Sequence, residues 1–352
     1  MKFTDAFLEP GNAEAADSYL RHLLRRPDPH IFIGAIRQLH TRFQVYASTS
    51  PAPLPAPGLI ITPEIRCQSE LYLPIAEISA VFTRLYHSTL NYPPLLSSTP
   101  FPDALSWADL FVALPERFRF SANPARLLEE LLSDNDLLTE FLFASFLPRR
   151  YYGGFQRYPH QREFLRTWLQ GKRHVRCLDA ACGCGEETYG LAGMMRELGN
   201  DDEDVIVEGW TIEPLEVWAA SQRRYPHNRQ REVLFQDATA ALLKTGYQRK
   251  IRFRCADLLD FAGFPQWSRF GLILCNGLLG GPIIHDTGQL ILAIENLATL
   301  LAPGGLLLAA DCFHGGWKKQ VPEQLIGELF RASGLRVMQA GEGIGGLKAD
   351  EG

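Results

Sequence analysis

The spacing of apolar residues changes near residue 148. Before that point, apolar residues recur at helical spacing in three stretches, at 16–24, 75–85 and 125–143. The third stretch follows Asn123-Pro124, a pair that suits a helix cap with proline in the first turn. The proline-rich segment at 49–58 predicts an extended linker. We therefore expect residues 1–148 to form a mostly helical domain.

After residue 148, short apolar runs alternate with longer amphipathic stretches. The runs that predict strands are 175–180, 205–212, 251–256, 270–275, 306–310, 335–339 and, less distinctly, 344–349. Helices are predicted between them at 186–198, 214–224, 228–250, 290–301 and 323–332, and the fourth is expected to stop at Pro303-Gly304-Gly305. The alternation predicts an α/β domain over residues 149–352 with a mostly parallel sheet.

The first predicted strand leads directly into a glycine turn, Cys182-Gly183-Cys184-Gly185, and then into a helix that opens on Glu186-Glu187. Glycine allows the unusual backbone angles of such a turn, and it lets a nucleotide-like ligand approach the backbone. A pyrophosphate would prefer the bare positive end of the helix dipole, whereas two carboxylates there repel phosphate. The sulfonium and ammonium groups of S-adenosylmethionine (SAM) suit the carboxylates, so the motif favours SAM over NAD.

Composition and charge narrow the possible partners and compartments. The chain has 352 residues, is 46% hydrophobic and carries a net charge of −5, which gives no reason to expect a nucleic-acid partner. It shows neither a signal peptide nor an apolar run of about 18 residues, so no membrane span is expected. Its seven cysteines are an odd number and predict reduced thiols in the cytoplasm. No second Cys/His pair accompanies Cys182 and Cys184 at zinc-like spacing, so no metal is expected.

Residues 185–192, GEETYGLA, resemble the GEExYSLA signature of CheR-type methyltransferases, which methylate glutamate side chains of chemotaxis receptors with SAM. Four further segments resemble this family in the family's order. They are Phe155-Gln156-Arg157 with His160 and Leu165, the strand-and-acid segment 251–261, the strand FGLILC at 270–275, and LAPGGLLLAAD at 301–311. The resemblance covers roughly residues 150–340. It implies a class I methyltransferase fold, with a Rossmann-like, doubly wound, mostly parallel sheet.

The resemblance also implies which residues hold the cofactor. Arg157 would bind the SAM carboxylate and Glu186 the ammonium, because a guanidinium pairs well with a carboxylate and a carboxylate with an ammonium. The other expected cofactor-binding residues are Ala181, Gly183 and Gly185 at the turn, Glu213 at the ribose, Asp257 and Leu258 at the adenine, and Asn276, Gly277 and Leu278 after the fourth strand. Ordinary alternatives remain for four of these residues. Arg157 could be one solvated arginine beside Arg149, Arg150 and Arg162, and Glu186 a helix N-terminal charge. Glu213 could be an ordinary residue before the helix-starting Pro214, and Asp257 a turn residue at the strand end.

The chain departs from the family pattern at three places. The ribose-binding acid of class I enzymes falls on Thr211, and Glu213 is the nearest acid. Receptor methyltransferases follow the fourth strand with R-N-x-x-I-Y-F, whereas this chain has Asn276 to Pro282, NGLLGGP, which we expect to be flexible. Residues 225–250, where some members carry a receptor-docking β-subdomain, are predicted to be helical. Specificity for chemoreceptors is therefore not expected.

The acceptor and the catalytic residues are not defined by the sequence. A carboxylate, of a protein or a small molecule, is the favoured acceptor because it is nucleophilic at neutral pH without a base. The loops at the carboxyl ends of the strands, where a general base would sit, contain His285, Asp286, Asp311 and His314. Each of the four is expected to be a polar loop residue rather than a catalyst. Trp317 either covers the acceptor pocket or closes a loop. The alternative function is a CheR-like module that binds SAM or S-adenosylhomocysteine (SAH) as a sensor or scaffold without catalysis. An NAD-dependent oxidoreductase is disfavoured by Glu186-Glu187.

Overall fold

The computed structural model describes residues 7–96, 99–147, 154–200, 205–260, 269–311, 313 and 315–350. Arg149, Arg150, Cys312 and His314 lie outside the described residues. The chain divides into two compact units. One comprises residues 1–16, 150–224 and 233–352, and the other comprises residues 17–149 and 225–232.

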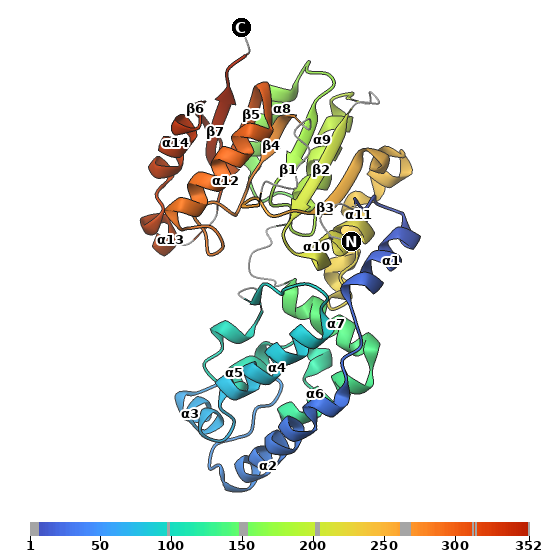
Figure 1. Cartoon of the computed structure of the whole chain (residues 1–352), viewed down its shortest axis with the longest axis vertical. Coiled ribbons are helices and arrows are strands. Elements are labelled where there is room, and N and C mark those ends of the chain that lie inside the picture. The colour runs from blue at the N-terminus through green and yellow to red at the C-terminus, as the bar shows by residue number, and fades with distance from the viewer. Residues whose placement is uncertain are drawn as a thin grey trace. The chain divides into compact units, whose positions relative to one another are not determined.

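The second unit is built from helices. Its α-helices, which Figure 1 colours from blue to green, are α2 (Ile33–Thr49), α3 (Pro63–Tyr72), α4 (Ile75–Thr89), α5 (Trp107–Ala113), α6 (Pro124–Ser133) and α7 (Asn135–Phe146), with short 3-10 turns at Pro29–Phe32, Phe101–Asp103 and Glu116–Phe118. Helix α1 (Ala13–Leu23) precedes them. The core of this helical unit is aromatic. The rings of Tyr86 and Phe141 stack with centroids 6.3 Å apart, and the Tyr86 hydroxyl lies 3.1 Å from Ser145 Oγ. The prediction of a mostly helical segment is therefore correct for the described part of this unit.

The stretch at 125–143, predicted as one helix, is two helices separated at Asp134. The Asp134 side chain accepts the backbone N–H groups of Asp136 (2.9 Å) and Leu137 (3.0 Å), which makes it the N-cap of α7. Aspartate competes for backbone donors in this way because its short side chain reaches them, so it starts a new helix rather than continuing the old one. The predicted cap of the first helix is confirmed, since Asn123 accepts from the Ala125 N–H at 3.0 Å.

The other unit contains a seven-stranded sheet in the order β3-β2-β1-β4-β5-β7-β6. The strands are β1 (Arg176–Asp179), β2 (Ile206–Thr211), β3 (Ile251–Cys255), β4 (Phe270–Leu274), β5 (Leu301–Ala310), β6 (Leu335–Ala340) and β7 (Gly343–Lys348). All pairs are parallel except those of β7, which runs antiparallel to β5 and β6. This mostly parallel sheet confirms the predicted class I methyltransferase fold. The strand order reverses beside β1, and ligands of such sheets bind at the carboxyl ends of the strands at this point.

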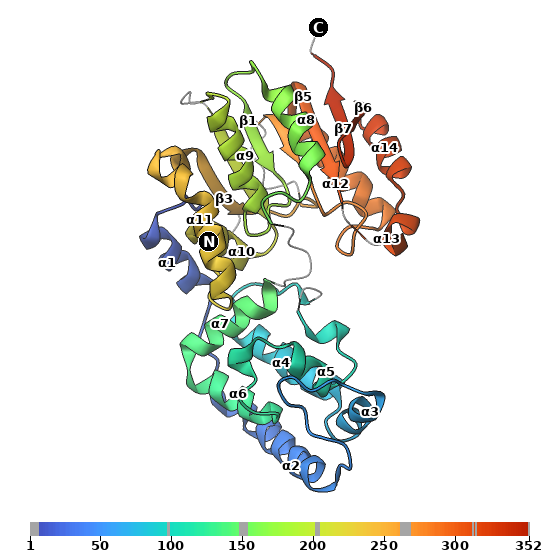
Figure 2. The ribbon, with the colours of Figure 1, turned by 180° about the vertical axis from the view of Figure 1, so that it is seen from behind.

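Helices cover both faces of the sheet. The helices that pack on its strands are α8 (Pro159–Leu169), α9 (Glu186–Glu197), α10 (Pro214–Gln222), α12 (Thr287–Leu300) and α14 (Glu323–Ala332). The chain also forms α11 (Arg229–Lys244), a 3-10 turn at Tyr247–Lys250 and α13 (Gly315–Gln320). Helix α12 lies in front of the sheet in Figure 1, and α8 and α9 lie over the opposite face in Figure 2. Ile273, Leu307, Ile294 and Phe330 are fully buried in the apolar core of this unit. Within the described ranges, no helix combines the length and the apolar character needed to cross a bilayer.

One strand differs from its prediction. Helix α12 ends at Leu300 as expected, but strand β5 already begins at Leu301 and includes Pro303-Gly304-Gly305. The pairing of β5 with β4 shifts from Phe270↔Leu301 to Leu272↔Leu306, so the proline and glycines form an irregular excursion within the strand. Gly304 adopts the left-handed φ of +66° there, which glycine tolerates best.

Candidate functional site

The glycine turn after β1 is a tightly packed connection between two elements. Gly183 and Gly185 have φ angles of +51° and +91°, and the Cys182 N–H donates to the Trp210 carbonyl at 2.9 Å. A Cβ at Gly185 would lie 2.9 Å from the Phe253 ring, which is too close for an ordinary contact. The prediction that these positions need glycine is confirmed. At Gly185 the steric reason is packing between α9 and the sheet as well as the turn.

Three acids gather at the N-terminus of α9, next to the turn. Asp179 is fully buried and Glu186 is 7% exposed, and Glu187 follows in the first helical turn. Thr188 Oγ1 donates to Asp179 Oδ2 at 2.8 Å, whereas no hydrogen bond of good geometry reaches the buried Asp179 Oδ1 from the described residues, although the Ala181 backbone N–H lies near enough to lower the pKa of this carboxyl. Burial and then the charge of Glu187 raise the pKa of Asp179 well above its usual range. An orphaned carboxylate oxygen at this place favours a ligand that brings a positive charge or an N–H donor.

Asn276, after β4, joins the acids to two other elements. Its amide nitrogen donates to Glu187 Oε2 at 3.0 Å and to Gln161 Oε1 at 2.7 Å. Its amide oxygen accepts from Gln161 Nε2 at 3.1 Å and from the Ala310 N–H at 2.9 Å. Asn276 is thereby fixed in one orientation at the carboxyl ends of β4 and β5. Gln161 was not among the predicted site residues, because no local pattern marks a pairing of side chains 115 positions apart.

Arg157 lies against the backbone that follows β4. A Cβ at Gly277 would be 3.2 Å from Arg157 Nη1, and Gly277 has a φ of +71°. The charge of Arg157 also acts on Glu187: burial raises the pKa of Glu187, while the Asn276 hydrogen bond and Arg157 oppose the rise. Arg157, Gln161 and Glu187 line one small recess between α8 and α9, together with Phe155, Leu165 and Met194. The structure therefore brings together Arg157, Asn276 and Gly277, as the resemblance implied, and places them beside Glu187.

Glu342 positions this side of the site from the turn between β6 and β7. Its carboxylate accepts the backbone N–H groups of His160 (2.9 Å) and Gln161 (2.7 Å) at the start of α8. Burial opposes ionisation of Glu342, but these two N–H groups, together with the backbone N–H of Glu342 itself and the charge of His160, outweigh it and lower its pKa. A Cβ at Gly341 would lie 2.2 Å from the Gln161 nitrogen, so the turn presses directly on the helix end. No sequence signal identified Glu342, because its partners are more than 180 residues away.

A second group of acids lies at the carboxyl ends of β2 and β3. Glu213 is buried and accepts the Leu215 N–H at 3.1 Å, which makes it the N-cap of α10. Thr211 Oγ1 donates to Glu216 Oε2 in the first turn of the same helix. Burial, followed by the charges of Glu213, Asp257 and Glu216, raises the pKa of Cys255 to about 12. All three acids therefore lie close enough to the Cys255 thiol to affect its ionisation.

Two features of the second acid group bear on the predicted contacts of ribose and adenine. Glu216 was missed because a glutamate three residues after an N-cap is expected to complete a capping box rather than to face a ligand. In the structure Glu216, as well as Glu213, lies beside Thr211, the position where class I enzymes carry the ribose-binding acid. Asp257 accepts the Leu259 N–H at 2.9 Å, and Asn296 Nδ2 donates to the Leu258 carbonyl at 2.7 Å. These bonds hold the predicted adenine-side loop in place.

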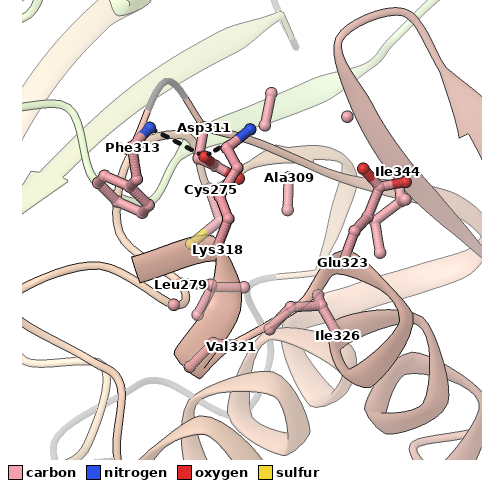
Figure 3. Close-up of a pocket in the computed structure, with 13 residues that line it drawn as sticks. Cys275, Leu279, Ala309, Asp311, Phe313, Lys318, Val321, Glu323, Ile326 and Ile344 are labelled. Atoms are coloured by element: carbon pink, nitrogen blue, oxygen red, sulfur yellow. Dashed lines mark hydrogen bonds and ion pairs between the residues drawn. The ribbon is translucent and has the colours of Figure 1, made fainter. Parts of the chain in front are cut away.

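A separate recess lies beyond the carboxyl ends of β4 and β5 (Figure 3). Asp311 Oδ1 accepts the Phe313 N–H at 2.9 Å and pairs with Lys318 Nζ at 3.2 Å. Trp317 packs near the His285 ring, with centroids 5.0 Å apart. Asp286, one of the loop residues considered as a base, is the N-cap of α12 and accepts the Gln289 N–H at 3.1 Å. Its structural role is therefore that of a cap.

The glycines after Asn276 allow close packing, and our expectation that they provide flexibility is wrong. A Cβ at Gly281 would lie 2.1 Å from Phe313 Cζ, which no side chain could accept without moving the ring. A Cβ at Gly280 would lie 3.0 Å from Val321 Cγ1, and Gly280 has a φ of +80°. Segment 276–282 is therefore glycine-rich because Phe313 and Val321 press against its backbone.

The residues at the glycine turn fit SAM on structural grounds. A positive ammonium would meet the buried acids and the orphaned Asp179 Oδ1, and a carboxylate would meet Arg157. Among the described residues, no group of three or more His, Cys, Asp or Glu side chains is arranged to hold a metal ion.

Comparison with known proteins agrees with this chemistry. Residues 156–311 match the family model described as the CheR methyltransferase SAM-binding domain. The chemotaxis protein methyltransferase of Listeria innocua is 30% identical over 208 residues, 56% of this chain and 73% of that protein, and its Listeria monocytogenes counterpart is 28% identical over the same shares. The probable biofilm formation methyltransferase WspC of Pseudomonas aeruginosa is 29% identical over 147 residues, 40% of this chain. The chain spans about a third of the length of that relative, 34%.

The matched region contains the features described above. It begins at Gln156, next to Arg157, and includes the glycine turn, both groups of acids and Asn276. It ends at Asp311, at the carboxyl end of β5. The cofactor of this domain is S-adenosylmethionine, as predicted from the glycine turn. The chain belongs to the CheR methyltransferase family.

Proposed function

We propose that the protein transfers the methyl group of SAM to a carboxylate acceptor. The observation that carries this proposal is the arrangement at the glycine turn, where Asp179 and Glu186 are buried beside the partly buried Glu187, and the Arg157 guanidinium acts on Glu187. The methionine part of SAM carries an ammonium, a carboxylate and a sulfonium. Such a zwitterionic ligand with an additional positive charge matches a site that combines several acids with one arginine.

Each part of the site has a role in this proposal. Arg157 binds the carboxylate of the cofactor and Glu186 its ammonium, while the backbone of Ala181, Gly183 and Gly185 lines the methionine moiety. On the other side, Glu213 or Glu216 receives the ribose hydroxyls, and Asp257 accepts from the adenine amino group. Bound SAM supplies a methyl group on a sulfonium, which is open to in-line attack by a nucleophile. The chain contributes to that attack mainly by positioning and by excluding water.

A carboxylate acceptor requires no general base from the described residues. It is already nucleophilic at neutral pH, so no general base is needed. Of the loop residues considered as bases, Asp286 caps α12, and Asp311 Oδ1 is engaged by the Phe313 N–H and by Lys318. Both carboxylates therefore already have structural partners.

The acceptor belongs to a protein or to a small molecule. The Listeria relatives, named chemotaxis protein methyltransferases, favour a protein acceptor. Helix α11 occupies 229–244, in the part of the chain where a receptor-docking β-subdomain would be expected in receptor methyltransferases. This difference favours an acceptor other than a chemoreceptor. The six described cysteines are free thiols, which agrees with a role in the reducing cytoplasm.

Calorimetry with SAH tests the cofactor site. Arg157→Ala and Glu186→Ala are each expected to weaken binding by about tenfold or more, because each removes a hydrogen bond between charged groups worth about 1.5–3 kcal/mol. Arg166→Ala is the matched control, since Arg166 lies on α8 but pairs at the surface with Glu197. The affinity of the Arg166→Ala variant for SAH should stay within about twofold of that of the unmodified protein.

Two results would count against the proposal in different ways. Failure of the unmodified protein to bind SAH would overturn the proposed function itself. If SAH binds and both site variants bind as tightly as the unmodified protein, the assignment of Arg157 and Glu186 is wrong.

A further inference from the structure

We propose that the recess beyond β4 and β5 is the acceptor site, and that Lys318 holds the carboxylate that receives the methyl group. This inference rests on the proposed function and adds to it the place and the recognition of the acceptor. This acceptor recess is bounded by Cys275, Leu279, Asp311, Lys318, Val321 and Ile326. Figure 3 shows these side chains around it.

The acceptor recess adjoins the cofactor residues. Two of its lining residues, Cys275 and Ala310, neighbour the Asn276 amide: Cys275 precedes it, and the Ala310 N–H donates to Asn276 Oδ1 at 2.9 Å. After burial, the charges of Asp179 and Glu187 raise the pKa of Cys275, so these acids lie within electrostatic range of the recess wall. A ligand in the recess would thus lie beside the residues assigned to the methionine end of the cofactor. This is the part of SAM that carries the methyl group.

The recess combines an apolar floor with charged groups at its mouth. Leu279, Val321, Ile326 and Ile344 supply the floor. Such a surface takes the aliphatic or aromatic part of a ligand, while a few polar groups fix its orientation. The charged lining residues are Asp311, Lys318 and Glu323, and of the described residues that line the recess Lys318 is the one lysine or arginine.

Lys318 is suited to hold a second carboxylate. Its ammonium has three N–H donors, and Asp311 Oδ1, 3.2 Å away, requires only one of them. The Lys318 side chain is 54% exposed and that of Asp311 is 33% exposed, so the pair is weak and is easily rearranged. Because the Phe313 N–H also donates to Asp311, the aspartate stays in place when the lysine turns toward a ligand. The pair therefore orients Lys318 without saturating it.

The charge of Glu323 allows an experiment to distinguish an anionic ligand from a cationic one. It is the first residue of α14, where the helix N-terminus favours a negative charge, and Figure 3 shows it on the side of the recess away from Asp311. A carboxylate ligand would be repelled by Glu323 and attracted by Lys318. A cationic ligand would show the opposite preferences.

The experiment compares butyrate, butylamine and butanol, which share one apolar chain and differ in the head group. Their binding to the SAH-loaded protein is measured by ligand-observed NMR. Butyrate is expected to bind best, Lys318→Gln to weaken it about fivefold, and Glu323→Gln to strengthen it. Lys319→Gln is the control, because Lys319 is the next residue of α13 and does not line the recess.

SAH affinity is measured for every variant, and it is expected to be unchanged in all of them. If SAH binds but butyrate does not bind, or binds equally well to the Lys318→Gln protein, the recess is not a carboxylate site and the inference is wrong. Preferential binding of butylamine, weakened by Glu323→Gln, would overturn it in favour of a cationic acceptor. Loss of SAH binding by the unmodified protein would instead refute the proposed function.

Discussion

Asp179→Asn is expected to make the protein more resistant to heat at neutral pH and to weaken SAH binding by about tenfold. The native carboxyl is fully buried, its Oδ1 receives no hydrogen bond of good geometry from the described residues, and its pKa lies well above the usual range because of burial and Glu187. Asparagine keeps an oxygen that can accept from Thr188 and removes the ionisable group. Each unit by which the pKa of the folded carboxyl exceeds its ordinary value costs about 1.4 kcal/mol of stability once the group is ionised, so removing the ionisable group should be measurable as a higher melting temperature.

The gain in stability has a defined pH dependence. With a raised pKa in the folded state, the unfolded chain ionises first as the pH rises above the ordinary value of 3.8. The unmodified protein therefore loses stability from that pH upward until the folded carboxyl has also ionised. The difference between the Asp179→Asn variant and the unmodified protein should vanish below the ordinary pKa, grow as the pH rises above it, and level off once the folded carboxyl has also ionised.

Thermal unfolding across this pH range, with calorimetry against SAH, measures both effects. Asp109→Asn is a matched control of opposite sign. Asp109 accepts two hydrogen bonds from Arg66, at 2.8 and 3.1 Å, and the net effect of these and of Ser106, against burial, is a lowered pKa. Its replacement should lower stability above the ordinary pKa and leave SAH binding unchanged. Tight SAH binding by Asp179→Asn would show that Asp179 lies outside the cofactor site.

Gly281→Ala should abolish most methyl transfer and leave SAH binding within about twofold. The added Cβ would lie 2.1 Å from Phe313 Cζ, so the ring must move out of its place against segment 276–282. Displacing Phe313 also disturbs Asp311, which accepts the Phe313 N–H, and through Asp311 the position of Lys318. The hydrogen bonds that hold Asp179 and Asn276 do not involve Phe313, so the affinity for SAH should be retained.

Transfer of tritium from methyl-labelled SAM measures the loss, and base-labile label identifies methyl esters. We expect at least about a tenfold decrease for Gly281→Ala, equivalent to about 1.4 kcal/mol. Gly315→Ala is the control, because a Cβ at Gly315, in the same segment as Phe313, meets no atom within 4 Å. Phe313→Ala should remove the added effect of Gly281→Ala in the double variant. Equal transfer by the Gly281→Ala and unmodified proteins would show that Phe313 does not shape the acceptor recess.

Local patterns in the sequence predicted most of the sheet. The apolar runs before the glycine turn and at FGLILC gave strands β1 and β4, because buried parallel strands are nearly continuous apolar runs. Helix α14 was predicted with its observed ends. The division of 125–143 at Asp134 was missed, since the apolar spacing continues across a residue whose capping role depends on its side-chain rotamer.

The site residues divide by the kind of information that identifies them. Gly185 and Glu186 lie within one motif, so their chemistry could be inferred from spacing alone. Asp179 was hidden in an apolar run, where it was taken as part of a strand rather than as a buried acid. Gln161 and Glu342 act through partners far away in the chain, and no local pattern encodes such contacts. Sequence therefore identified the ligand type better than the network that positions the ligand.

The bonds between Glu342 and α8 have a consequence for the order in which the protein is made. His160 and Gln161 leave the ribosome long before Glu342, which follows them by 182 and 181 residues. Until the β6–β7 turn has been translated, the first backbone N–H groups of α8 lack their carboxylate, although β1 and α9 are already complete. Because chains fold from the N-terminus during synthesis, the glycine turn can form early, and the segment that carries Arg157 is secured last. A nascent chain thus gains these two hydrogen bonds only after residue 342 has been translated.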